Sequence, residues 1–143
     1  MPQREEMKPG EALYKEALQY NWKASAVSTM TARAGFERAA ALHHTGALRE
    51  LAEMMFAGAG GPREQERAIG VKWTAVRLGD IEALEDLSAM LESYAEELLR
   101  DGGDSERAAR ASANAEKAHE LLMSLGSYVD DVCRYAGLSD GQV

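Results

Sequence analysis

The residues of this chain that could bind a metal ion are few, and their spacing does not support such a site. Glu116 and His119 have the Glu-x-x-His spacing that di-iron proteins use on a helix. Such a site needs a second copy of the pair, but the positions three residues before His43 and His44 hold alanine. Adjacent histidines on a helix also point about 100° apart, which is unfavourable for sharing one ion. We therefore expect no metal ion, and we interpret His43 and His44 as partly exposed surface residues.

Residues for nucleophilic or phosphate-binding chemistry are also lacking. Cys133 lies beside Val129 and Val132 on a short apolar-faced segment, which favours a small buried hydrophobic residue over a nucleophile. A single cysteine excludes an internal disulfide and suits a reducing compartment. The glycines at 58–61 are not followed by the Lys-Ser/Thr of a phosphate-binding loop. We expect no catalytic residue and no cofactor, so the chain is predicted not to be an enzyme.

Acidic residues form the first candidate binding surface. Residues 80–106 contain ten acidic side chains and one basic one, and they account for almost all of the net charge of −8. On a helix over 81–100 the acids fall opposite Leu84, Leu87 and Leu91. A charged helix face is usually only a solvated surface. Here no Lys or Arg relieves the like-charge repulsion before Arg100, which favours a docking surface. The candidate partner-binding residues are Glu82, Glu85, Asp86, Glu92 and Glu96.

Four aromatic residues, Trp22, Phe36, Phe56 and Trp73, form a second candidate surface. The set includes residues, such as Phe56, that lie off the main apolar stripes of their predicted helices. In a stack of helices such residues often contact the next unit, and otherwise they serve as anchors for a partner. The acidity of the chain makes nucleic acid a poor partner and favours a basic protein.

The elements that must position these surfaces are predicted to be helices. Ala and Leu dominate the composition while Val and Ile are scarce, which favours helix over sheet. We expect one domain over 10–137, between flexible tails at 1–9 and 138–143. The first predicted helix covers residues 10–34, with a candidate bend at Asn21 and Ser25, and is ended by Gly35. The other predicted helices are 37–44, 47–57 with Thr45 as a candidate cap, 62–78 starting at Pro62, 81–100, 104–125 ended by Gly126, and 127–135.

An internal repeat links two of these helices. Leu48, Leu51, Met54 and Met55 recur 36 residues later as Leu84, Leu87, Met90 and Leu91. A glycine-rich segment and a further helical pattern lie between the copies. Self-similarity of this period is typical of an array of helix–turn–helix units that pack against their neighbours.

Residues 46–83 resemble the SEL-one-like repeat, a relative of the tetratricopeptide repeat. The residues that match are Ala47-Leu48, Leu51-Ala52, Met54-Met55, Gly58-Ala59-Gly60-Gly61-Pro62, Ala68, Leu78-Gly79-Asp80 and Ala83-Leu84. The second copy departs from the pattern, because its glycine-rich turn is reduced to Gly102-Gly103. The resemblance implies a short right-handed α-solenoid of two to three degenerate repeats and a role in protein–protein contact. It implies no catalytic residues.

We therefore interpret the chain as a non-catalytic, acidic protein-binding module with one protein partner. Within that class we favour a bacterial immunity or antitoxin-like protein that binds a toxin or effector. An adaptor in signalling or assembly and a structural homo-oligomer are the alternatives. The polar N-terminus and the absence of a long apolar run predict a cytoplasmic protein without a membrane segment, either monomeric or homodimeric.

Overall fold

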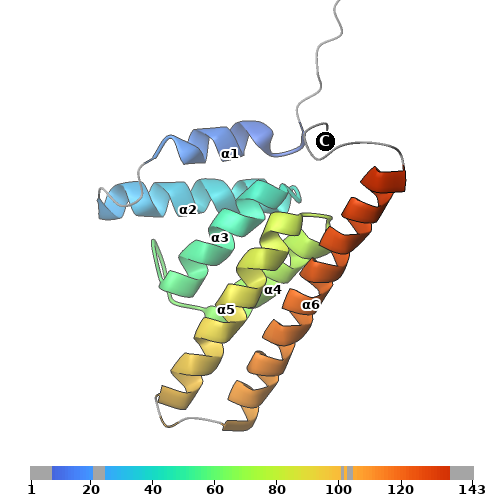
Figure 1. Cartoon of the computed structure of the whole chain (residues 1–143). Coiled ribbons are helices and arrows are strands. Elements are labelled where there is room, and N and C mark those ends of the chain that lie inside the picture. The colour runs from blue at the N-terminus through green and yellow to red at the C-terminus, as the bar shows by residue number, and fades with distance from the viewer. Residues whose placement is uncertain (1–7, 21–24, 101, 103–104, 136–143) are drawn as a thin grey trace, which may run out of the picture. The chain divides into compact units, whose positions relative to one another are not determined.

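The computed structural model describes residues 8–20, 25–100, 102 and 105–135, with side chains given up to residue 125. These residues form six α-helices, and no strand occurs among them, which confirms the all-α prediction (Figure 1). None of the helices in these ranges is long and apolar enough to cross a membrane. The helices are α1 (Glu11–Leu18), α2 (Ala26–Ala41), α3 (Thr45–Ala57), α4 (Gln65–Arg77), α5 (Ile81–Arg100) and α6 (Ser105–Tyr135).

The chain divides into two compact units, residues 1–83 and 84–143, with the boundary inside α5. The single domain over 10–137 stays a prediction. Most of the predicted tails, residues 1–7 and 138–143, lies outside the described residues.

In the first unit α1 packs on α2, α2 on α3 and α3 on α4, so that neighbours in sequence are neighbours in space. The core consists of small and medium apolar side chains around Phe36, which is almost completely buried. Burial of such side chains contributes roughly 25 cal/mol per Å² of apolar surface removed from water. The other large members of this core are Leu48, Leu51, Met54 and Met55.

The turn between α3 and α4 depends on glycine and on a buried arginine. Gly58 and Gly60 have φ values of 75° and 73°, a backbone conformation that residues with a Cβ rarely adopt. Arg33 of α2 donates hydrogen bonds to the carbonyl oxygens of Ala59 and Pro62, at 3.2 and 3.4 Å. These bonds attach the turn to α2 and satisfy two carbonyl groups of the turn itself.

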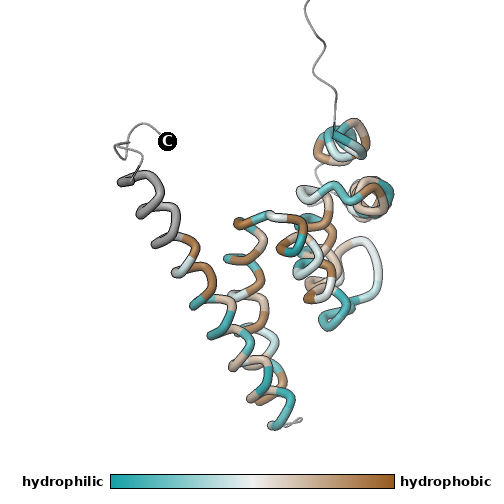
Figure 2. Tube along the Cα trace, turned by 90° about the vertical axis from the view of Figure 1, so that its right-hand side faces the viewer, coloured by the Kyte–Doolittle hydropathy of each residue, from teal (hydrophilic) through white to brown (hydrophobic). Residues whose placement is uncertain are grey.

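In the second unit an alanine stripe on α6 packs close to α5. The hydroxyl of Ser88 donates to the Ala115 carbonyl oxygen at 3.2 Å, and Arg107 donates to the Tyr94 hydroxyl at 2.6 Å. Hydrophobic and hydrophilic positions alternate along both helices (Figure 2), as expected for helices with one buried side. The buried alanines of α6 are Ala108, Ala111, Ala115 and Ala118.

Several predicted boundaries are wrong. The helix predicted over 10–34 is two helices, and the second begins after the cap residue Ser25, whose hydroxyl accepts from Ser28 N–H at 3.1 Å. Gly35 does not end a helix. It lies inside α2, where an added Cβ would be 2.8 Å from the Ala17 side chain, so it permits close approach of α1. The segment predicted as a separate helix over 37–44 is largely the C-terminal end of α2.

Three more boundaries differ at helix ends. His44, not Thr45, caps α3, and its Nδ1 accepts a hydrogen bond from Ala47 N–H at 3.1 Å. α4 begins at Gln65 rather than at Pro62. Gly126 does not end a helix, because α6 continues to Tyr135. A glycine inside a helix costs only about 1 kcal/mol relative to alanine, which the rest of a long helix can offset.

Candidate functional site

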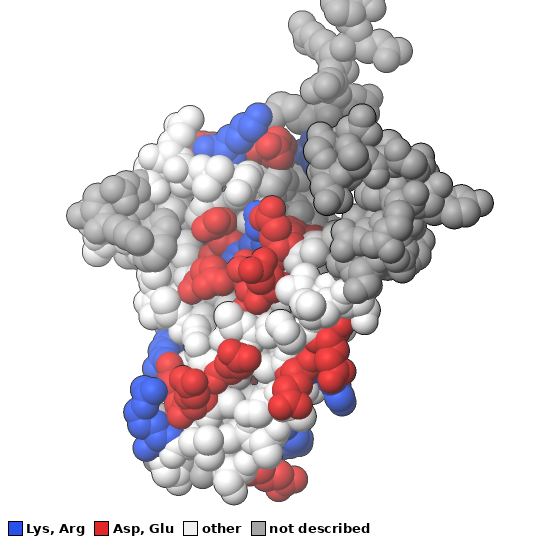
Figure 3. Space-filling model, in the orientation of Figure 1, with Lys and Arg blue, Asp and Glu red and all other residues white. Residues whose placement is uncertain are grey.

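The acidic side chains predicted as a binding surface follow α5, and red side chains gather along this helix in Figure 3. Glu85, Glu92 and Glu96 are exposed and lie seven and four residues apart, which places them on one stripe. We call these three residues the acidic stripe. None of their carboxylates forms an ion pair with any described residue.

The other two predicted acids are placed differently. Glu82 is exposed but forms an ion pair with Arg49 of α3. Asp86 is half-buried and has an interaction partner. These two residues are therefore less available to a partner than the three acids of the stripe.

The stripe points outward because the opposite side of α5 is apolar and buried. Leu84, Leu87 and Leu91 are at most 7% exposed, as the sequence pattern predicts. Withdrawal of each leucine side chain from water contributes about 1.5–3 kcal/mol. This burial fixes the rotation of the helix and keeps the carboxylates in solvent.

The four predicted aromatic residues differ in accessibility. The prediction that Phe36 is an exposed surface residue is wrong, because it is almost completely buried in the core of the first unit. Trp22 lies outside the described residues. Trp73 of α4 is 42% exposed, whereas Phe56 of α3 is half-buried. Of these two, Trp73 is therefore the more accessible to a partner.

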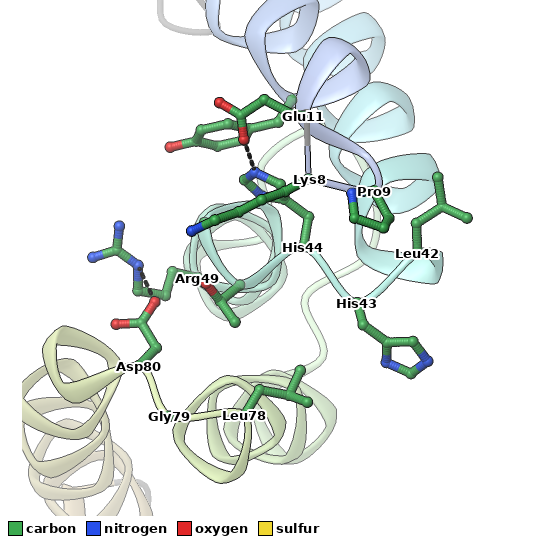
Figure 4. Close-up of a pocket in the computed structure, with 13 residues that line it drawn as sticks. Lys8, Pro9, Glu11, Leu42, His43, His44, Arg49, Leu78, Gly79 and Asp80 are labelled. Carbon is green, nitrogen blue, oxygen red and sulfur yellow. Dashed lines mark hydrogen bonds and ion pairs between the residues drawn. The ribbon is translucent and has the colours of Figure 1, made fainter. Parts of the chain in front are cut away.

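A pocket in the first unit was not predicted from the sequence. It has a volume of about 650 Å³ and lies between the start of α1, the α2–α3 turn and the α4–α5 turn (Figure 4). His44 and Glu11 are joined by a 2.5 Å hydrogen bond between Nε2 and Oε2. Because His44 Nδ1 accepts from Ala47 N–H, the ring carries its proton on Nε2 and donates it to the carboxylate. This hydrogen bond, the largest cause, lowers the pKa of Glu11 below 4.5 although partial burial opposes the shift.

An aromatic contact forms the floor of the same pocket. The rings of Tyr14 and His44 have centroids 4.4 Å apart and planes inclined by 31°. Burial raises the pKa of the Tyr14 hydroxyl, and the Glu50 carboxylate adds to the shift. Gly46 makes room for both rings, since a Cβ there would lie 2.9 Å from Tyr14 Cζ and 3.0 Å from His44 Cε1. The missed signal in the sequence is this glycine, the second residue of α3 and two residues after a histidine.

Arg49 forms the opposite wall of the pocket. Its Nε lies 3.1 Å from Asp80 Oδ2, and its Nη1 pairs with Glu82. Burial acts to lower the pKa of Arg49, but the Glu82 hydrogen bond and the Asp80 charge outweigh it and raise the pKa. Asp80 also accepts from Ala83 N–H at 3.2 Å, which caps the start of α5. The Glu11–His44 hydrogen bond thus connects α1 with the start of α3, and the Arg49 ion pairs connect α3 with the first residues of α5.

A buried lysine is the second feature that sequence reasoning missed. The side chain of Lys72 is fully buried, and its Nζ lies 2.7 Å from Glu53 Oε1 and 3.3 Å from the Arg49 carbonyl oxygen. Lys72 lies on the same stripe of α4 as the buried residues Ala68 and Ala75, four and three residues away. A lysine on an alanine stripe is the signal that could have found it.

The described histidines occupy different environments. The prediction that His44 is a partly exposed surface residue is wrong, because it is buried and both ring nitrogens are hydrogen-bonded. His43 is exposed and has a φ of 61°. Glu116 and His119 are exposed on α6. Within the described residues, no group of three or more His, Cys, Asp or Glu side chains is arranged to hold a metal ion.

Comparisons with protein-family models, curated proteins and solved structures found no match to this chain.

Proposed function

We propose that the chain is a non-catalytic binding module that recognises one basic protein partner through the acidic stripe of α5. The observation that carries this proposal is a difference in ion pairing between the carboxylates of the first unit and those of the acidic stripe. In the first unit most described carboxylates, among them those of Glu11, Glu53 and Asp80, have cationic or histidine partners, and only Glu16 and Glu50 lack one. The three carboxylates of the stripe have none among the described residues.

Unpaired like charges on one helix face cost a few tenths of a kcal/mol each. A basic partner removes this repulsion on binding and is attracted from a distance by the field of the stripe. The stripe therefore suits fast, salt-sensitive association with a basic protein.

We also propose that α3 and α4 form one degenerate helix–turn–helix repeat of a short right-handed α-solenoid. The positive φ values of Gly58, Gly60 and Gly79, at both ends of α4, support this view. They are the turn positions in the resemblance to SEL-one-like repeats. Such repeats imply protein–protein contact, which agrees with a binding role.

The more specific role that we favour is a bacterial immunity or antitoxin-like protein that binds a basic toxin or effector. Its support is the small size and strong acidity of the chain together with the repeat resemblance. An adaptor in signalling or assembly would use the same stripe, so the identity of the captured partner separates the two.

The test compares two charge reversals of identical size and spacing. E92K/E96K changes the acidic stripe, whereas E116K/E120K changes two exposed glutamates of α6 that also lie four residues apart. Each tagged protein is incubated with lysate of the native host at low and at high salt, and the captured proteins are identified by mass spectrometry. We expect a basic protein that wild type and E116K/E120K retain at low salt, that E92K/E96K loses, and that added salt releases. An identical set of captured proteins for both variants would refute the proposal.

A further inference from the structure

Apolar side chains are exposed on the outer surface of the α1–α2 pair. Tyr20 is 39% exposed, and Val27 and Met30 on α2 are 74% and 60% exposed. Between residues 26 and 34 the only charged side chain of α2 is that of Arg33, which is buried on the other side. A helix that is apolar on its outward side as well as its inward side is typical of a helix with neighbours on both sides.

A groove runs between the two helices. α1 and α2 are antiparallel, since Gly10 lies against Ala39 at one end and Ala17 lies against Gly35 further along. Figures 1 and 2 show the two helices side by side, in the second case nearly end-on. The groove has a volume of about 140 Å³ and includes Leu13, Glu16, Tyr20, Thr31, Ala34 and Arg38 in its lining.

The charges beside this groove are of opposite sign and lie on different helices. Glu16 of α1 and Arg38 of α2 are both exposed, and neither side chain forms an ion pair within the described part of the chain. A two-fold interface requires a surface that complements itself, so that each group meets its counterpart on the other copy. One free acid and one free base, at similar heights on two antiparallel helices, meet this requirement.

We infer that the α1–α2 surface binds a second copy of this chain about a two-fold axis that runs along the groove. This axis places α1 of each copy over α2 of the other at the same height. Glu16 of each copy then faces Arg38 of the other, and Tyr20 faces the region of Met30. The surface belongs to the first unit whereas the acidic stripe belongs to the second, and it adds self-association to the proposed partner binding.

The size of the surface sets the expected strength of the dimer. The 16 residues of α2 span about 24 Å. A face two helices wide and of this length is smaller than the roughly 800 Å² per partner of standard interfaces, so we expect a dissociation constant in the micromolar range.

Sedimentation equilibrium of the full chain, from about 1 to 500 μM, tests the inference across that range. E16R and R38E each place like charges opposite each other twice per dimer, and we expect each to raise the dissociation constant at least about tenfold. The double variant E16R/R38E restores opposite charges, so its constant should return to within about threefold of wild type. The matched controls E120R and R110E change exposed residues of α6 and should leave the constant unchanged.

Other outcomes overturn the inference. A wild-type chain that is monomeric at every concentration would show that this surface does not bind a second copy. A dimer that tolerates M30E, with folding checked by circular dichroism, would place the interface elsewhere. Failure of the double variant to restore association would refute the two-fold arrangement. E92K/E96K should dimerise as wild type does, so a failure of the acidic-stripe proposal and a failure of this one are distinguishable.

Discussion

Mutation of Glu53 should lower the free energy of unfolding, whereas mutation of its ion-pair partner Lys72 should leave it unchanged or raise it. Lys72 is fully buried whereas the side chain of Glu53 is 53% exposed. E53A leaves a buried ammonium without its carboxylate, and breaking a buried pair from one side costs about 3–5 kcal/mol. Because Glu53 is half in water and the Arg49 carbonyl still accepts from Lys72, we expect a loss of about 2–3 kcal/mol. K72M keeps an unbranched side chain of similar length and returns Glu53 to water, so we expect no loss or a gain of up to about 1 kcal/mol.

Urea unfolding followed by tryptophan fluorescence measures both variants, since Trp22 and Trp73 belong to the first unit. Arg33 and Glu37 provide a control, because they also combine a buried cation, 7% exposed, with a glutamate that is 56% exposed. Two backbone carbonyls of the α3–α4 turn accept from Arg33, so E37A should cost less than about 1 kcal/mol. If K72M proved more destabilising than E53A, the ammonium would make a net favourable contribution and the reasoning would be refuted.

Two further changes test the turn and the pocket. G60A should destabilise by roughly 1–3 kcal/mol in urea, because φ is +73° and a Cβ would lie 2.9 Å from a backbone oxygen of α2, whereas G70A, in an open helical position, should stabilise by about 0.5–1 kcal/mol. An equal effect of both would contradict the strained turn. The hydrogen bond from His44 lowers the pKa of Glu11, so its contribution is present above about pH 4.5 and is lost as pH falls through the folded-state value. The stability difference between wild type and E11Q should therefore shrink from pH 6 to about pH 3, and a constant difference would argue against the pKa shift.

Sequence analysis predicts a structural feature well where the residues that determine it are neighbours in the sequence. The helix over 81–100 was predicted with its exact ends, because a strongly amphipathic pattern lies between Asp80 and Asp101. Glycine was a poorer guide. Gly58 takes a positive φ in a turn, whereas Gly35 lies inside a helix to admit Ala17. Nothing in the neighbouring sequence separates these two uses, because the second depends on a residue 18 positions away.

The pocket was missed for the same physical reason. Glu11 and His44 are 33 residues apart, and their hydrogen bond exists only once α1 packs beside the start of α3. Arg49 and Glu53 lie four residues apart on α3, a spacing that allows an ion pair, but Arg49 pairs with Asp80 and Glu53 pairs with Lys72. Local spacing allows an i,i+4 pair worth a few tenths of a kcal/mol, and a tertiary partner in a less exposed setting easily outweighs it.

The structure separates the five acidic residues of α5 that the sequence analysis proposed together as a binding surface. From spacing alone, the five candidate acids of α5 are equivalent, since each falls opposite the leucines. Tertiary packing separates them, because Arg49 reaches Glu82 across 33 residues and Asp86 is half-buried. A surface selected only for solubility would be expected to mix both signs of charge. The three remaining carboxylates, with no basic side chain supplied to them by α5 or by any other described element, are the part of the prediction that most needs a partner outside the chain.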